Sequence, residues 1–267
     1  MLNFLNGLDQ DLQKALLTQL RNLWTHTSTA IEGNTLTLGE TAFVLEEGLT
    51  ISGKPLKDHE EVVGHAKAID LVYDFIRSGA DLAEKDLFDL HKAVRTERIM
   101  DVYKPVGDWK VEPNSTVIVS GNDQIIFEYA PPKDVPELMQ GWLGMFQKIC
   151  RENAVNKEAV LSAYACLHVS FVRIHPFWDG NGRIARLIAN IPVIRAGFPP
   201  IIIPKERRKA YIDALSEYHL AVGTVRAGSE LLPELDKLDR FKRFCAESWS
   251  ESIKYVDEAH KKQKERN

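Results

Sequence analysis

Apolar residues recur at helical spacing along most of the chain, and this period constrains the fold more than any other feature of the sequence. In the first such stretch, Leu12, Leu16, Leu20 and Leu23 lie near one face of a helix. The same spacing predicts further helices at 56–77, 82–97, 135–151, 157–173, 182–196, 205–222 and 230–261. The sequence therefore favours a fold built almost entirely from packed helices.

Two helix boundaries have recognisable start signals. Thr37 followed by Glu40 has the spacing of a capping box, so a second helix is expected from there to about Gly48. Pro233 lies early enough in the last predicted helix to be tolerated in its first turn.

One stretch departs from the helical pattern. Residues 115–132 (STVIVSGNDQIIFEYAPP) place β-branched and aromatic residues on both sides of Ser-Gly-Asn-Asp, which is typical of a β-hairpin. With no repeat and no long linker, the chain is predicted to form an all-α domain that carries one hairpin.

Composition restricts the class of protein. The chain has 267 residues, of which 44% are hydrophobic, and a net charge of −4, which argues against a general nucleic-acid or anionic-membrane surface. No apolar run approaches the roughly 18 residues of a membrane span and no leader pattern begins the sequence, so a cytoplasmic location without membrane contact is expected. Cys150, Cys166 and Cys245 are widely separated, which predicts reduced thiols.

Residues 175–186 (HPFWDGNGRIAR) gather charged and titratable groups around a glycine turn. Gly180 and Gly182 allow close approach of a ligand to the backbone, and a helix beginning near Asn181 would aim its free N–H groups at the same place, as in a phosphate cradle. Arg183 and Arg186 lie away from the apolar face of that helix and would bind phosphate oxygens.

The remaining polar residues of this stretch suggest a reaction. Asp179 would repel a bare phosphate unless a cation intervened, and Mg²⁺ accepts one or two carboxylates together with phosphate oxygens and water. His175 is the group able to take a proton near neutral pH, so it is the candidate general base. The chain lacks GxxxxGK[ST], which argues against a P-loop enzyme, and a Mg²⁺-dependent phosphate-handling transferase is predicted.

The same stretch resembles the signature of the Fic family, H-P-F-x-D-G-N-G-R-x-x-R, at every specified position. The resemblance implies a Fic-type helical bundle and transfer of AMP from ATP to a Ser, Thr or Tyr hydroxyl of a protein. His175 would be the base, Asp179 would hold Mg²⁺, and the following glycines, Asn181 and both arginines would bind the phosphates. GDWK (107–110) is similar to the family element Gly-x-Tyr-Arg, with Trp109 and Lys110 as departures.

The resemblance also implies roles outside the motif. The hairpin would be a flap on which a target segment docks, with Thr116, Val117, Ile118 and Val119 as the docking strand. RAGFPPIIIPKERRKAY (195–211) is similar to the family's continuation, which makes Tyr211 a candidate for the nucleotide-base pocket.

A second family pattern, [S/T]xxxE[G/N], matches STAIEGN at 28–34 with Ser28, Glu32 and Gly33 in register. The match implies an inhibitory glutamate that pairs with Arg186 and excludes the γ-phosphate, in the class whose inhibitory helix precedes the Fic domain. IEGNTLTL and IHPFxDGNGR are most similar to the animal endoplasmic-reticulum branch, in which this glutamate also supports removal of AMP. The expected division is an N-terminal region, 1–34, and a catalytic region, 35–267, in one compact unit.

Several alternatives stay open on the sequence alone. The fold could transfer UMP, phosphocholine or phosphate, or it could be a non-catalytic regulator that senses nucleotide. A zinc hydrolase using His168, His175 and Asp179 is a remoter alternative, since His168 follows a helical apolar pattern. The partners expected from the resemblance are ATP and a hydroxyl-bearing protein, the chain itself included, and a homodimer is plausible.

Overall fold

The computed structural model describes residues 2–95, 101–120, 123–152 and 156–266. Within these ranges the α-helices are α1 (Gln10–Ile31), α2 (Leu38–Glu47), α3 (Leu56–Ser78), α4 (Glu84–Val94), α5 (Val135–Arg151), α6 (Lys157–Ile174), α7 (Asn181–Ile188), α8 (Asn190–Arg195), α9 (Arg208–Val222), α10 (Asp239–Ser248) and α11 (Ser250–Arg266). Short 3₁₀ turns lie at Asn3–Leu5, Pro132–Asp134, Lys205–Arg207 and Leu235–Leu238. The predicted helical fold is confirmed.

Side-chain caps explain two of these helix starts. The Thr37 hydroxyl accepts from the Glu40 backbone N–H at 3.2 Å, and the Glu40 carboxylate accepts from the Thr37 N–H at 2.7 Å. This is the predicted capping box, and α2 ends at Gly48 in the left-handed conformation. Asn156 caps α6 through a 2.9 Å bond from the Ala159 N–H.

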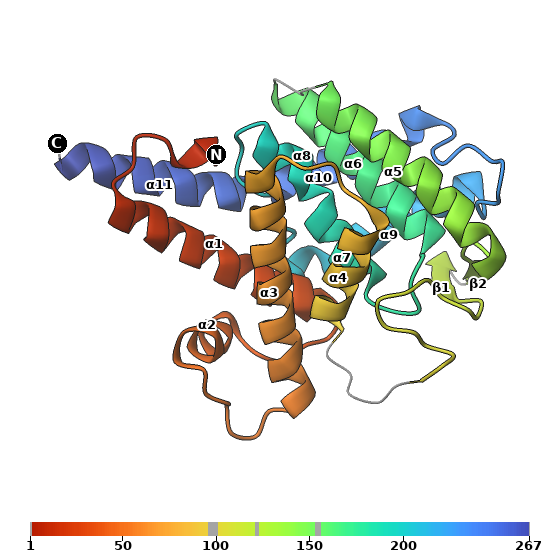
Figure 1. Ribbon diagram of the computed structural model, residues 1–267, viewed down its shortest axis with the longest axis horizontal. Helices are drawn as coiled ribbons and strands as arrows, with labels where there is room; N and C mark the ends of the chain where they lie inside the picture. Colours follow the sequence, from red (N-terminus) through yellow and green to blue (C-terminus); the bar gives the residue numbers. More distant parts are fainter. Residues whose placement is uncertain (1, 96–100, 121–122, 153–155, 267) are drawn as a thin grey trace.

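Helix α6 occupies the centre of the domain. It contacts α5, α7, α8 and α10 (Figure 1). The buried ring of Trp142 from α5 packs on Phe171 of α6, with the ring centroids 5.3 Å apart. The Trp142 indole N–H donates to the backbone oxygen of Leu167 on α6, so the polar atom of this fully buried ring is satisfied. The rigid packing of α6 fixes the position of the residues that follow its C-terminal end.

The first and last α-helices, α1 and α11, lie side by side and extend together from the body of the domain (Figure 1). Gln263 accepts from the Asp9 N–H at 2.7 Å and donates to its carboxylate at 3.1 Å. Arg266 donates to both carboxylate oxygens of Asp11, at 2.9 and 2.7 Å. These contacts hold the first turn of α1 against the last turns of α11.

The predicted hairpin is present as β1 (Ser115–Ser120) and β2 (Asp123–Glu128), which pair antiparallel with Val117 opposite Ile126. Successive side chains alternate between the two faces: Ile118 is 4% exposed, whereas Val117 and Val119 are 57% and 68% exposed. One face of the hairpin therefore packs on the domain and the other is open.

Two predicted helices differ from the structure. The stretch expected at 182–196 is divided into α7 and α8, because Pro192 cannot donate to the carbonyl of Ile188 and its ring crowds that carbonyl. The single helix expected at 230–261 is wrong: residues 230–234 are not helical, Glu234 adopts a positive φ of 54°, and α10 and α11 follow separately.

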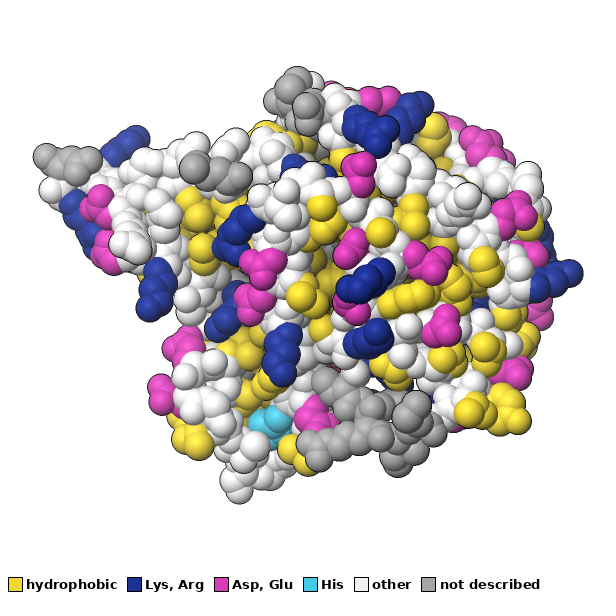
Figure 2. Space-filling view, viewed as in Figure 1, with side chains coloured by type: hydrophobic (Ala, Val, Ile, Leu, Met, Phe, Trp, Pro, Cys, Tyr) yellow, Lys and Arg dark blue, Asp and Glu magenta, His cyan; other side chains and the backbone are white. Residues whose placement is uncertain are grey.

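Charged side chains of both signs are interspersed over the face that carries α3 and α4 (Figure 2). Local pairs account for part of this pattern, such as Arg77 with Asp74 at 2.8 Å and Lys85 with Asp89 at 2.6 Å. No described helix combines the length and the apolar character needed to cross a bilayer.

Candidate active site

A cavity of about 180 Å³ lies where the loop after α6, the start of α7, α9, the hairpin and the end of α1 meet. The residues that line it are Glu32, Thr116, Val117, Tyr129, Val172, His175, Asp179, Gly180, Asn181, Gly182, Arg186, Tyr211, Ile212, Leu215, Ser216 and His219. Most residues predicted for the site are therefore brought together around one cavity, although they come from positions far apart in the chain.

His175 follows the last turn of α6 in a left-handed conformation, with φ 53° and ψ 59°. Its backbone N–H still donates to Phe171, so the ring is presented at the helix end. The ring Nδ1 lies 3.2 Å from the Val172 carbonyl oxygen, which can only accept, and this fixes the proton on Nδ1 and leaves Nε2 as the free base. Burial, and next the charge of Lys110, lower the pKa of His175 to about 3, so the ring is neutral at pH 7.

The loop between His175 and α7 is held from within by Asn181. Its amide accepts from the Phe177 N–H at 2.9 Å and donates to the Phe177 carbonyl at 2.8 Å. Gly180, with φ 82°, makes the left-handed turn that starts α7. The side chain of Asn181 thus shapes the predicted phosphate cradle, and the cradle itself is formed by backbone at the start of α7.

Gly182 lies where the side chain of Glu32, at the end of α1, approaches α7. A Cβ at this position would lie 2.8 Å from the Glu32 Oε1 and 3.2 Å from the Arg186 Nη1. The absence of a side chain therefore gives the carboxylate of Glu32 access to the arginine.

Arg186 is 2% exposed and has partners on α1 and α9. It donates to Glu32 Oε1 at 2.6 Å, to the Ser28 hydroxyl at 3.0 Å and to the Ser28 carbonyl at 2.9 Å. A fourth bond runs to the Tyr211 hydroxyl at 3.2 Å. Gly33, with φ 103°, ends α1 as predicted and directs Glu32 toward α7.

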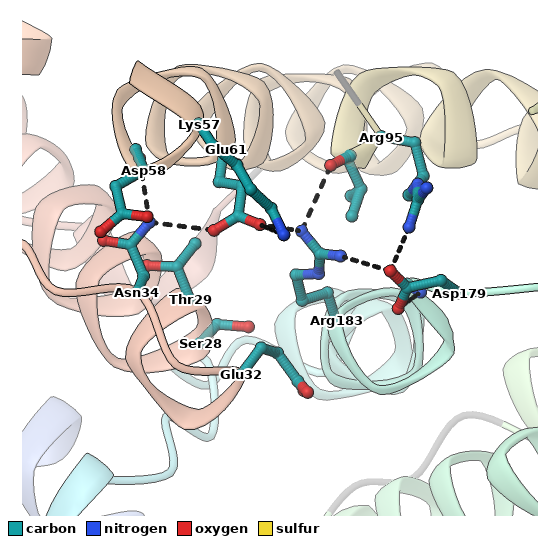
Figure 3. Close-up of polar contacts among 12 residues, drawn as sticks. Ser28, Thr29, Glu32, Asn34, Lys57, Asp58, Glu61, Arg95, Asp179 and Arg183 are labelled. Atoms are coloured by element: carbon teal, nitrogen blue, oxygen red, sulfur yellow. Dashed lines mark hydrogen bonds and ion pairs between the residues drawn. The ribbon is translucent and has the colours of Figure 1, made fainter. Parts of the chain in front are cut away.

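Arg183 lies on a different side of α7 from Arg186, so the two predicted phosphate ligands diverge. Arg183 is 4% exposed, and its guanidinium lies 3.8 Å from Glu61 of α3 and 3.8 Å from Asp179 (Figure 3). It is not among the described residues that line the cavity. Its charge acts on the cavity through the neighbouring carboxylate of Asp179, whose pKa it lowers.

Asp179 lies at the mouth of the cavity with a half-exposed carboxylate that pairs with Arg95 and Arg183 (Figure 3). Burial raises its pKa, but the charges of the two arginines outweigh this and lower the pKa overall. The carboxylate is therefore ionised at neutral pH and is accessible to a ligand in the cavity.

A polar chain connects the segment after Glu32 with Arg183 (Figure 3). The Asn34 amide donates to the Asp58 carbonyl at 2.9 Å and to Glu61 Oε2 at 3.0 Å. The other oxygen of Glu61 is the one 3.8 Å from Arg183. The end of α1, the first turns of α3 and the first turn of α7 are thus joined by side chains.

Tyr211, the candidate for the nucleotide-base pocket, lines the cavity from α9 and is 2% exposed. Burial raises the pKa of its hydroxyl to about 12, and that hydroxyl lies 3.0 Å from His168 Nε2. His168 is fully buried behind Tyr211, which agrees with its interpretation as a core histidine. Among the residues that the structure describes, no three His, Cys, Asp or Glu side chains converge as metal ligands, so the zinc alternative gains no ligand set.

The predicted docking strand reaches the cavity in part. Thr116 and Val117 line it, Ile118 points into the body of the domain, and Val119 lies toward the outer end of the hairpin. The open edge of β1 beside the cavity is compatible with pairing of an extended segment.

Sequence reasoning missed several residues at this site. Tyr129 lies against His175, Lys110 and Asn114 lie beneath the loop after His175, and Glu61 lies beside Arg183. Of these residues, Lys110 could have been noticed in the sequence, because it departs from the family element Gly-x-Tyr-Arg. The others come from elements whose approach depends on tertiary packing.

Comparisons with known proteins point to one family. A profile described as Fic/DOC family matches residues 81–192. The chain is similar to "Protein adenylyltransferase Fic" of Drosophila erecta, with 33% identity over 188 residues that cover 70% of this chain and 35% of the fly protein. It is also similar to "Protein adenylyltransferase fic-1" of Caenorhabditis briggsae, with 33% identity over 198 residues that cover 72% of this chain and 36% of the worm protein. The chain spans about a third of the length of these curated relatives.

Solved structures extend the similarity over almost the whole chain. A Fic domain containing signaling protein from Bacteroides thetaiotaomicron superposes with a TM-score of 0.82 at 27% identity and covers 95% of this chain and 92% of its own. Fic-1 from C. elegans superposes with a TM-score of 0.70 at 25% identity, over 97% of this chain and 69% of its own.

Proposed function

The chain belongs to the Fic family, and from this we propose that it is a protein adenylyltransferase that transfers AMP from ATP to a hydroxyl side chain of a protein. The observation that carries the proposal is the neutral imidazole of His175 in one cavity with Arg186 and the glycine turn. The curated relatives described above are named for the same activity.

In the proposed reaction, His175 Nε2 takes the proton of the acceptor hydroxyl. The hydroxyl oxygen forms a bond to the α-phosphorus of ATP, the bond from that phosphorus to the bridging oxygen breaks, and pyrophosphate leaves. The backbone N–H of Gly182 and the guanidinium of Arg186 are placed to stabilise phosphate charge, whereas the Gly180 N–H donates to the Asp179 carboxylate at 2.5 Å. Tyr211 is proposed to lie at the base end of the same cavity.

The donor set fits Mg²⁺. Asp179 offers one ionised, half-exposed carboxylate at the cavity mouth, and Mg²⁺ is bound in nucleotide sites by one or two carboxylates with phosphate oxygens and water. When bound, the ion would neutralise phosphate charge. Arg95 and Arg183 orient the carboxylate that would hold it.

We further propose that Glu32 inhibits the transfer by holding Arg186. The 2.6 Å contact uses the guanidinium that a γ-phosphate would need, and Ser28 holds the same guanidinium from α1. The region 1–34 would then act as the inhibitory part and 35–267 as the catalytic part. A second role of Glu32, in removing AMP from a target, remains part of the proposal.

The proposed partners are ATP and a protein with an accessible hydroxyl, including this chain itself through automodification. Docking of the target on Thr116 and Val117 would bring its hydroxyl to His175. A homodimer and a cytoplasmic location stay predictions from the sequence.

Intact-mass spectrometry after incubation with Mg²⁺ and ATP tests the activity. Glu32→Gly should gain the mass of one or more adenylyl groups faster than the native chain, and His175→Ala in the Glu32→Gly background should gain none. Parallel incubations with UTP, CDP-choline and GTP test the donor. Labelling from UTP alone would replace AMP by UMP, and nucleotide binding without labelling in any variant would favour a non-catalytic regulator.

A further inference from the structure

The ring of Tyr129 lies flat against the ring of His175. The two centroids are 3.7 Å apart and the planes are inclined by only 10°. Tyr129 is the first residue after β2, so this contact joins the hairpin directly to the proposed base. Stacking covers one face of the imidazole and does not block the in-plane contacts of its two nitrogens.

Backbone and side-chain contacts of Asn114 explain why the two rings meet. Its carbonyl accepts from the Tyr129 N–H at 3.2 Å, and its amide donates to the Phe177 carbonyl at 3.0 Å. The buried amine of Lys110 donates to the side-chain amide oxygen of Asn114 at 2.6 Å. Asn114 therefore ties the base of the hairpin to the loop that follows His175.

The Val172 carbonyl holds the imidazole from its edge, whereas Tyr129 covers its face. It accepts from Nδ1 at 3.2 Å, so the ring can neither turn over nor lose its tautomer without breaking this bond. With Nδ1 occupied and one face covered by Tyr129, the edge that carries Nε2 is the part of the ring left for an acceptor hydroxyl.

We propose that Tyr129 is a positioning residue for His175, which holds the imidazole plane and stabilises the imidazolium formed when His175 takes the proton of the acceptor hydroxyl. This inference rests on the proposed transferase activity. The π-electrons on the face of an aromatic ring attract a cation placed over them, so the stack is stronger after proton transfer than before it. The proton moves from oxygen to Nε2, the oxygen electron pair bonds to phosphorus, and the proton later passes to solvent.

The other charged or titratable groups near His175 act on its protonation in both directions. Lys110 from the segment before β1 and His219 from α9 lower the pKa of His175 together with burial, and Asp179 from the loop before α7 raises it. Glu32 and Arg186 line the same cavity. Burial is the largest of these effects. His175 is only partly exposed to solvent, so the protonated ring loses part of its hydration, and the face of Tyr129 substitutes for part of that loss.

Three substitutions at position 129 separate the possible roles of the ring. In the Glu32→Gly background, Tyr129→Phe should keep kcat within about twofold, because the ring face is retained. Tyr129→Leu should lower kcat about tenfold, equivalent to about 1.4 kcal/mol, with little change in the KM for ATP. Pentafluorophenylalanine at position 129 keeps the shape and reverses the charge distribution of the face, so it should lower kcat like leucine while leaving thermal stability close to that of the phenylalanine variant.

A measurement without catalysis tests the stack itself. In NMR spectra of the ¹⁵N- and ¹³C-labelled full chain at pH 7, with His175→Ala used for assignment, the ring protons of His175 should lie upfield of their usual position. This displacement should persist in Tyr129→Phe and disappear in Tyr129→Leu. An unchanged shift and unchanged kcat in Tyr129→Leu would overturn the proposal, as would a Tyr129→Phe variant as slow as Tyr129→Leu. If Glu32→Gly itself transfers no AMP, the proposed function fails, and the NMR result still decides whether the rings are stacked.

Discussion

Replacing Glu32 by glutamine should destabilise the free protein and strengthen its binding of ATP. The glutamine keeps the size of the side chain but removes the charge that lies 2.6 Å from Arg186. Arg186 would keep its bonds to Ser28 and Tyr211, so the guanidinium would stay in place without an ionic partner.

The size of both effects follows from the burial of the pair. Breaking a fully buried ion pair costs about 3–5 kcal/mol, and an exposed pair contributes about 0–1 kcal/mol. Arg186 has 2% of its side chain exposed, but Glu32 has 40%. We therefore expect Glu32→Gln to lower the free energy of unfolding by about 1–2 kcal/mol. If the γ-phosphate must displace the carboxylate, removing this competition should raise the affinity for ATP about 5- to 30-fold.

Thermal unfolding with and without Mg²⁺ and ATP, together with calorimetric titration, measures both quantities. Without nucleotide, Glu32→Gln should melt about 2–8 °C below the native chain, on the scale of about 2–4 °C per kcal/mol. With saturating nucleotide its increase in Tm should exceed that of the native chain. The matched control is Glu46→Gln, which neutralises a carboxylate that is bonded to Asn22 at 2.8 Å but lies outside the cavity. The reasoning is refuted if the two variants bind ATP with the same affinity as the native chain.

Three further perturbations test the energetics of the fold. Lowering the pH from 7.5 to 5 should reduce the free energy of unfolding by up to about 2 kcal/mol for each of His91 and His219. Burial lowers the pKa of both side chains to about 3, so only the unfolded state takes up a proton in this range. A free energy of unfolding that stays constant in urea titrations over this pH range would contradict the prediction. Arg173→Ala should lower the free energy of unfolding by about 3 kcal/mol, measured by calorimetry, because this buried side chain donates to four backbone carbonyls. A decrease below about 1 kcal/mol would refute this prediction. In urea unfolding, Glu61→Ala should lower the free energy of unfolding by about 1–2 kcal/mol, because it removes the carboxylate beside buried Arg183. Glu61→Gln should lower it by less. An equal decrease in both variants would show that the charge of Glu61 is not involved.

Much of the fold could be predicted because its signals are local. The capping box at Thr37 and the β-branched residues around the 120–123 turn act within a few residues of one another, and both predictions are confirmed. The helix expected at 230–261 failed because periodicity does not detect a reversal of the backbone such as the positive φ of Glu234. The division at Pro192 was missed although a proline inside a helical pattern is itself a local signal.

In the candidate site, too, the residues that belong to local motifs could be predicted and those brought in by tertiary packing could not. The residues of 175–186 could be assigned from one contiguous motif, and the contact of Glu32 with Arg186 from a second. Tyr129 lies 46 positions before His175, and its contact depends on how the hairpin region packs against the end of α6 and against His219 of α9. The divergence of Arg183 from Arg186 also depends on α3, whose Glu61 has no sequence pattern linking it to the motif.

The attachment of Asn34 and Thr35 to the first turns of α3 has a consequence for timing. Because Asp58 accepts from the Thr35 N–H at 2.8 Å and Glu61 accepts from Asn34 at 3.0 Å, the chain immediately after Glu32 is anchored while the carboxylate itself is 40% exposed. A half-exposed side chain changes rotamer within picoseconds to nanoseconds, whereas detaching a packed helix takes microseconds or longer. A rotation of the Glu32 side chain alone would therefore uncover part of the Arg186 guanidinium while α1 keeps its place.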